Sequence, residues 1–103
     1  MTALPDDVVA YRRTPTFDEN SIPAALLRHH ATKAGVWGLI HVEAGKLRYE
    51  IEETGETQDI AAGDPPAVIM PAIRHRVSPL GDVRFHVEFL RTPEADDDKS
   101  RAP

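Results

Sequence analysis

The sequence predicts an all-β domain, either a sandwich or a barrel of short strands. Nine prolines and six glycines are spread over 103 residues. Because proline removes a backbone donor and clashes inside a helix, they leave little room for long helices. Between these breakers lie short segments typical of strands, separated by turn residues about every 8–12 positions. A chain of this length supports one hydrophobic core, so a single domain is expected.

The first half of the domain contains the clearest strand pair. Ala24–His30 is a short apolar run that suits either a strand or one helical turn. Val36–Val42 is rich in β-branched and aromatic residues, and Leu47–Glu52 alternates apolar with charged residues, as a half-buried strand requires. Because Glu43–Lys46 contains a glycine, we expect a turn there and a hairpin between the two strands.

The second half repeats the pattern of short strands and turns. Further strands are expected at Gln58–Ile60, Ala67–Met70, Arg74–Val77 and Val83–Leu90. The separating turns are expected at Glu53–Glu56, Gly63–Pro66, Pro71 and Pro79–Asp82. On the last strand Phe85, Val87 and Phe89 share one face, because side chains alternate along a strand.

The two ends of the chain differ in composition from the middle. We interpret residues 1–10 as a flexible N-terminus, residues 11–93 as the folded domain and residues 94–103 as a disordered acidic tail. The tail, EADDDKSRAP, has no aliphatic side chain larger than alanine. It therefore cannot bury enough apolar surface to offset the entropy lost on ordering.

Composition excludes several classes of function. The chain has no cysteine, which excludes disulfides, thiolate metal sites and cysteine nucleophiles. A formal net charge of −5, with twelve scattered basic residues, disfavours nucleic acid as a partner. No apolar run approaches the ~20 residues of a membrane span, and the N-terminus does not have the pattern of a signal peptide. We therefore expect a cytoplasmic location with no membrane partner.

Three blocks of the sequence carry a family resemblance. His29–Trp37, Glu43–Tyr49 and Met70–Val77 resemble the small cupin family that contains YeaR-like proteins and the N-terminal domain of TehB-type tellurite-resistance proteins. In such relatives a tryptophan often precedes the late histidine, whereas Arg74 stands there in this chain. The resemblance implies a cupin barrel (a double-stranded β-helix, or jelly roll) that is usually dimeric, with room for a metal and no agreed reaction for the free-standing domain.

The resemblance also implies a metal site built from histidine. Cupin enzymes combine histidines and an acid from early strands with a histidine from a late strand, and the matching positions here are His30 and His75. His86 and Glu88 are further candidate ligands if their face lines the interior. Because neutral imidazole binds zinc, iron and nickel, we expect one of these divalent metals. With no glycine-rich loop and no methyltransferase portion, we expect no nucleotide cofactor.

The other histidines are predicted outside the interior. Successive residues of a strand point to opposite faces, so only one of His29 and His30 can face inward, and the resemblance selects His30. Alternation along Val36–Val42 sends His41 to the outer face.

The same alternation places Trp37 and Leu39 on the outer face as the start of an apolar patch. Either a second copy of the chain or the N-terminal segment, through Tyr11 and Phe17, could cover this patch. We expect a homodimer, since cyclic dimers are the commonest closed assembly.

Three classes of function remain open from the sequence. The first is a small-molecule-binding or sensing cupin that contains a metal and acts in a tellurite or oxidative/nitrosative stress response. The second is a metal-dependent enzyme, an oxygenase or isomerase, and the third is a structural dimerisation module. The enzyme is disfavoured because His29 and His30 are adjacent instead of alternate, and no catalytic residue is assigned.

Overall fold

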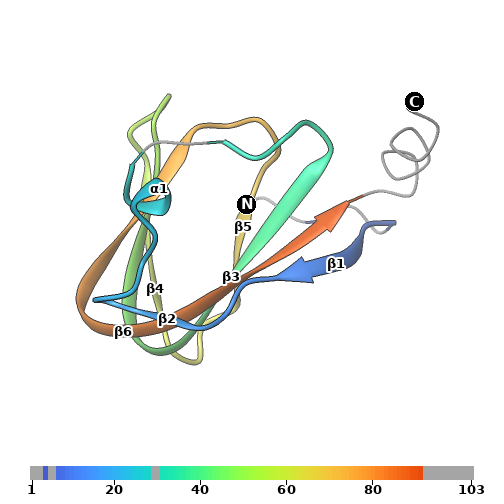
Figure 1. Ribbon diagram of the computed structural model, residues 1–103. Coiled ribbons are helices and arrows are strands. Elements are labelled where there is room, and N and C mark those ends of the chain that lie inside the picture. Colours follow the sequence, from blue (N-terminus) through green and yellow to red (C-terminus); the bar gives the residue numbers. More distant parts are fainter. Residues whose placement is uncertain (1–3, 5–6, 29–30, 92–103) are drawn as a thin grey trace.

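The computed structural model describes residue 4, residues 7–28 and residues 31–91. Its elements are β1 (Val9–Arg13), β2 (Phe17–Asp18), α1 (Ala24–Leu27), β3 (Val36–Ile51), β4 (Thr57–Ala61), β5 (Ala67–Ile69) and β6 (His75–Arg91). The strands form one antiparallel sheet in the order β1-β6-β3-β4, with β2 also paired to β6 and β5 also paired to β3 (Figure 1). The predicted all-β class is confirmed.

Two long strands dominate this sheet. β3 has 16 residues and β6 has 17, and they pair from Val36 opposite Arg91 to Ile51 opposite His75. Figure 1 shows both strands curving strongly, so that the sheet wraps around an interior. The shorter strands widen the curved sheet on both sides.

The predicted hairpin between Val36–Val42 and Leu47–Glu52 is wrong. Both segments lie in β3, apart from Glu52 just beyond its end, and both pair with β6. Glu43–Lys46 bends the strand without reversing it, and the register with β6 shifts there. The turn predicted at Pro79–Asp82 is wrong for the same reason, since these residues lie within β6.

The conformation of Gly45 explains why its presence wrongly predicted a turn. Its φ is +74°, and a Cβ built there would lie 1.9 Å from the carbonyl oxygen of Asp82. The glycine is therefore required by the close approach of β3 and β6 at a β-bulge, and not by a chain reversal.

The predicted inward face of β3 is confirmed. Ile40, Val42, Leu47 and Tyr49 are all buried. Val42 and Leu47 are five positions apart, which in a regular strand would place them on opposite faces. The register shifts between them restore a common face.

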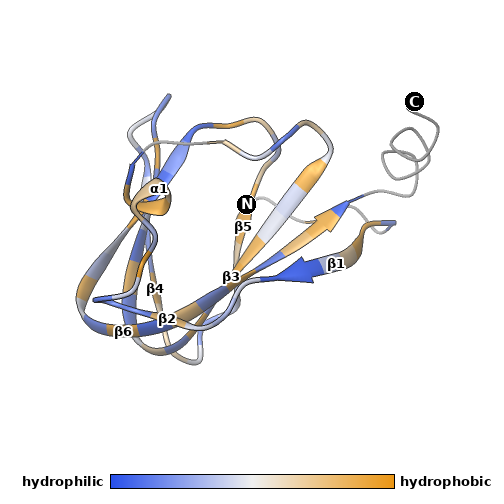
Figure 2. Cartoon of the chain, viewed as in Figure 1, coloured by the Kyte–Doolittle hydropathy of each residue, from blue (hydrophilic) through white to orange (hydrophobic). Residues whose placement is uncertain are grey.

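The hydrophobic core lies within the curve of the sheet. Phe85 and Val87 of β6 are buried and Phe89 packs partly buried against the core, so the apolar face of this strand is the inner one. Figure 2 shows apolar and polar residues alternating along β6. The core cluster consists of Ile40, Val42, Leu47, Tyr49, Ile60, Ala67, Ile69, Val77, Val83, Phe85 and Val87.

The described residues include one short helix ahead of β3. Ala24–Leu27 is helical, and Leu26 packs against the core. β1 begins at Val9, within the predicted N-terminal segment 1–10, while residues 94–103 lie outside the described residues. None of the helices in the described part of the chain is long and apolar enough to cross a membrane.

Candidate functional site

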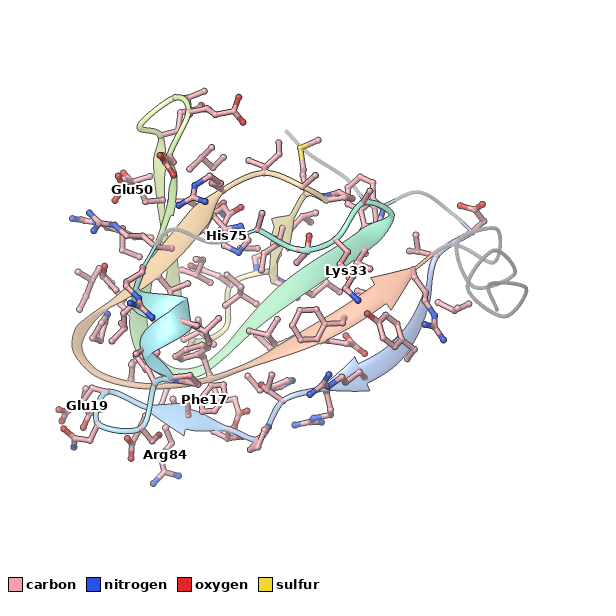
Figure 3. The ribbon with its side chains drawn as sticks, turned by 45° about the horizontal axis from the view of Figure 1, so that its top comes forward. Phe17, Glu19, Lys33, Glu50, His75 and Arg84 are labelled. Atoms are coloured by element: carbon pink, nitrogen blue, oxygen red, sulfur yellow. The ribbon has the colours of Figure 1, made fainter. Side chains whose placement is uncertain are left out.

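Among the residues that the structure describes, the interior contains one polar pair, Tyr49 and His75. His75, at the start of β6, has an exposed fraction of 1% and is the one fully buried ionisable group besides Tyr49 in the described residues. The two rings are tilted by 45°, with centroids 5.4 Å apart. Figure 3 shows His75 inside the curve of the sheet. Buried polar groups need hydrogen-bond partners.

His75 is held by the backbone that precedes it. Its Nδ1 lies 2.9 Å from the carbonyl oxygen of Ile73. A carbonyl oxygen only accepts, so Nδ1 carries the proton and donates. In the neutral ring Nε2 is then the acceptor.

The hydroxyl of Tyr49 is buried without a hydrogen bond to another described residue. The side chain has an exposed fraction of 4%, and burial raises the pKa of Tyr49 to about 12, because a low-dielectric surrounding disfavours the phenolate. At neutral pH the hydroxyl is therefore protonated and able to donate a hydrogen bond.

A pocket of about 500 Å³ lies beside this tyrosine. We call it the Tyr49 pocket. Its wall is formed by the end of β3, the start of β4, the β4–β5 loop and β5, through Ile51, Thr57, Pro65 and Ala67 among others. Its volume is within the range of about 300–1,000 Å³ found for small-molecule sites. The arrangement can bind a small molecule that offers an acceptor to the hydroxyl.

His86 and Glu88 lie on the other side of the sheet from His75. Their neighbours Phe85 and Val87 face the core, so alternation turns His86 and Glu88 outward. The sheet therefore does not bring them together with His75. His30, the other predicted ligand, lies outside the described residues, as does His29.

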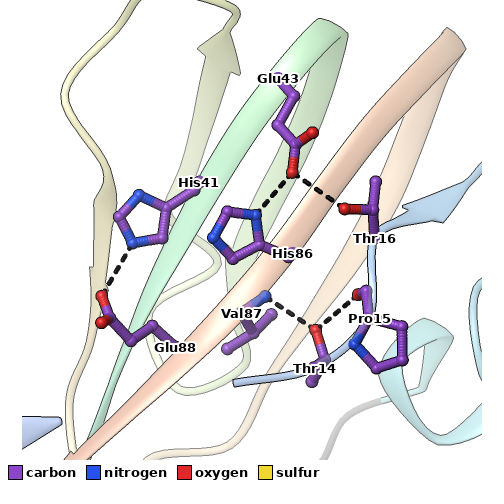
Figure 4. Close-up of polar contacts among 8 residues, drawn as sticks. All are labelled: Thr14, Pro15, Thr16, His41, Glu43, His86, Val87 and Glu88. Carbon is purple, nitrogen blue, oxygen red and sulfur yellow. Dashed lines mark hydrogen bonds and ion pairs between the residues drawn. The ribbon is translucent and has the colours of Figure 1, made fainter. Parts of the chain in front are cut away.

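On the outer face these residues form two histidine–carboxylate pairs, drawn in Figure 4. His41 Nε2 lies 3.1 Å from Glu88 Oε1, and His86 Nδ1 lies 2.6 Å from Glu43 Oε2. Thr16 Oγ1 donates a second hydrogen bond to Glu43 Oε2 at 3.0 Å. These bonds, that of His86 first, lower the pKa of Glu43 below its ordinary value.

Comparison with known proteins assigns the chain to a family. Residues 12–87 match the family described as the TehB-like domain. The chain belongs to this TehB-like family. The predicted relationship to TehB-type proteins is thus confirmed, while the resemblance to YeaR-like proteins stays a prediction.

The curated relatives are much longer than this chain. The probable S-adenosyl-L-methionine-dependent methyltransferase TehB of Haemophilus influenzae is 29% identical over 83 residues, which cover 77% of this chain and 29% of the relative. The TehB of a second Haemophilus influenzae strain is 28% identical over 83 residues, again 77% of this chain and 29% of the relative. The chain therefore spans less than a third of the length of these relatives.

Solved structures share the fold of this TehB-like domain. A protein from Escherichia coli superposes with a TM-score of 0.84 at 24% identity, covering 90% of this chain and 99% of that one. TehB from Haemophilus influenzae superposes with a TM-score of 0.81 at 25% identity, covering 93% of this chain and 35% of that one. A Neisseria meningitidis protein is more distant, with a TM-score of 0.52 at 12% identity, covering 87% of this chain and 79% of that one.

The predicted cofactor, a divalent metal without a nucleotide, is corrected by these findings. The curated relatives are named as S-adenosyl-L-methionine-dependent enzymes. The described residues contain no group of three or more histidine or acidic side chains that could hold a metal ion. The physical reason is the strand alternation that places His86 and Glu88 on the face opposite His75.

Proposed function

We propose that this TehB-like domain is a cupin-type small-molecule-binding domain that serves methyl transfer of the TehB type in tellurite resistance. The observation that carries the proposal is the buried side chain of Tyr49, which lines the Tyr49 pocket. The cupin jelly-roll identity is part of the proposal. It is supported by the two long curved strands, β3 and β6, which enclose one apolar interior with a polar pair inside.

The energetics favour a ligand at this hydroxyl. A buried hydroxyl that lacks a partner costs about 1–3 kcal/mol of stability. A ligand that supplies an acceptor to the Tyr49 hydroxyl satisfies this donor, and such a hydrogen bond contributes about 0.5–1.5 kcal/mol. The ring of His75, itself held by the Ile73 carbonyl, packs against Tyr49 and limits its rotation.

The cofactor of the relatives supplies a methyl group when bound. In many nucleotide-binding folds the cofactor lies at a glycine-rich turn between a strand and the start of a long helix. Within residues 7–28 and 31–91 the helix found has four residues, Ala24–Leu27. These residues do not fit such a site, and we assign no step through the cofactor to them.

The proposal is tested by titrating the domain with two small acceptors, N-methylacetamide and dimethyl sulfoxide, and following backbone amide signals by NMR. We expect the shifted signals to cluster at Ile51, Thr57 and Ala67, which line the Tyr49 pocket. Tyr49→Phe should weaken binding about fivefold or more, since it removes the donor and little volume. The matched control Tyr11→Phe, on β1, should bind as the unchanged protein does. Shifts elsewhere, or equal binding by both variants, would contradict the proposal.

A further inference from the structure

A second pocket lies where β6 ends and β3 begins. It has a volume of about 590 Å³, and its wall includes Tyr11, Arg12, Lys33, Val36, Phe89 and Arg91. We call it the basic pocket. It shares no lining residue with the Tyr49 pocket.

The lining combines positive charge with apolar surface. Arg12, Lys33 and Arg91 contribute three cations, and none of the ten described lining residues carries a carboxylate. The whole chain has a formal net charge of −5. The charge of the described lining is therefore opposite in sign to the net charge of the chain. Phe89 and Val36 add apolar surface to the same lining. This combination suits an anion that carries an apolar group.

The loop that carries Lys33 is held in place by hydrogen bonds. Val36 N donates to the carbonyl oxygen of Lys33 at 3.0 Å, and Thr32 Oγ1 donates to the carbonyl oxygen of Val36 at 2.8 Å. Ala72 N donates to the carbonyl oxygen of Thr32 at 3.1 Å and ties the loop to the segment before β6. Figure 3 shows Lys33 on this loop, close to the end of β6. A loop fixed in this way loses little entropy when a ligand binds.

The other two cations are positioned by the sheet. Arg12 lies opposite Phe89 in the pairing of β1 with β6. The guanidinium carbon of Arg91 lies 4.1 Å from the ring centroid of Tyr11, a cation–π contact that joins the same two strands. The positive charges thus come from two paired strands and one braced loop.

We propose that the basic pocket binds an organic carboxylate whose apolar group is about the size of one ring. The carboxylate accepts hydrogen bonds from Lys33 and Arg12, and the ring packs on Phe89 and Val36. This site is separate from the Tyr49 pocket, so the proposal stands or falls independently of the function proposed above.

The test compares benzoate with its neutral analogue benzamide. Isothermal titration calorimetry measures the affinity for each compound. We expect benzoate to bind at least tenfold more tightly than benzamide, and to bind more weakly as salt is raised.

Variants locate the site. Lys33→Met and Arg12→Met keep most of the side-chain length and should each weaken benzoate binding about tenfold. Lys46→Met, which removes an exposed cation on β3 outside the pocket, is the matched control and should bind normally. Thermal melts of all variants show that they fold.

Four outcomes would overturn the proposal: no benzoate binding, equal binding of benzamide, unchanged affinity in both Lys33→Met and Arg12→Met, or loss of benzoate binding in Tyr49→Phe. The last would place the anion in the Tyr49 pocket and leave the proposed function intact.

Discussion

The imidazole rings of His41 and His86 stack across β3 and β6, with centroids 4.7 Å apart and planes 13° apart. The two residues face each other directly in the strand register. Each ring is also bonded to a carboxylate, His41 to Glu88 and His86 to Glu43. Each ring of the stacked pair is therefore held by a carboxylate of its own.

The hydrogen-bonded carboxylate of Glu43 should make the free energy of unfolding fall at acid pH. Its pKa lies below the ordinary 4.5, first because of the hydrogen bond from His86 and then because of Thr16. The folded state thus favours the ionised carboxylate, so its contribution to stability is present above pH 4.5 and is lost as the pH falls through the lowered pKa. Glu43→Gln should flatten the fall of the urea midpoint below pH 4.5.

The matched control is Glu53→Gln in the exposed β3–β4 turn, which should keep the acid profile of the unchanged protein. Coincident profiles for Glu43→Gln and the unchanged protein would show that the pair with His86 does not stabilise the fold.

The buried phenol of Tyr49 should make the free energy of unfolding fall at alkaline pH. Burial raises its pKa from 10.0 to about 12, so the folded state favours the neutral phenol. Its contribution to stability is full below pH 10 and is lost as the pH rises from 10 towards 12. Urea midpoints across this range should fall less steeply for Tyr49→Phe than for Tyr11→Phe. Absorbance at 295 nm should show one tyrosine titrating near pH 12, and complete titration of both by pH 11 in the folded protein would refute this.

Gly45→Ala should destabilise the domain far more than Gly55→Ala. Both glycines have a positive φ, +74° and +71°, which costs an alanine about 1–2 kcal/mol. The added Cβ would meet nothing within 4 Å at Gly55 but the Asp82 carbonyl oxygen at Gly45. We expect a loss of about 1 kcal/mol for Gly55→Ala and more than about 3 kcal/mol for Gly45→Ala, where overpacking adds to the strain. Equal losses in urea unfolding would mean that β3 and β6 do not approach closely there.

Phe85 should be the most costly core residue to truncate. It has an exposed fraction of 0% and meets Phe17 edge-on, with ring centroids 5.7 Å apart. Phe85→Ala should lower the free energy of unfolding by about 3–5 kcal/mol. Leu80→Ala, at an exposed position in β6, should change it by less than about 1 kcal/mol. Similar losses for both would place the core elsewhere.

The homodimer remains a prediction. Trp37 and Leu39 lie on the outer face of β3, half-buried, and a second copy could cover them. Light scattering should give twice the chain mass of 11.4 kDa, and Leu39→Lys should shift the particle towards one chain while Leu80→Lys should not. A single-chain mass for the unchanged protein would count against the dimer.

The sequence by itself determined the strand class and which face of β3 is buried. Period-two alternation identified the inward residues of both halves of β3, and it grouped Phe85, Val87 and Phe89 on one face of β6 without deciding that this face is the buried one. The strand class and the buried face are local properties, because a few consecutive residues are enough to show the alternation of apolar and polar side chains.

The tertiary structure alone decided how the strands connect and which polar groups meet. A glycine with positive φ serves a turn and a bulge equally well, so only the approach of Asp82 shows that Gly45 belongs to a continuous strand. The stacking of His41 on His86 depends on the strand register, which pairs two residues 45 positions apart along the chain. Likewise, the cations of the basic pocket come from three separate segments. Such contacts arise from long-range pairing, which no short window of sequence contains.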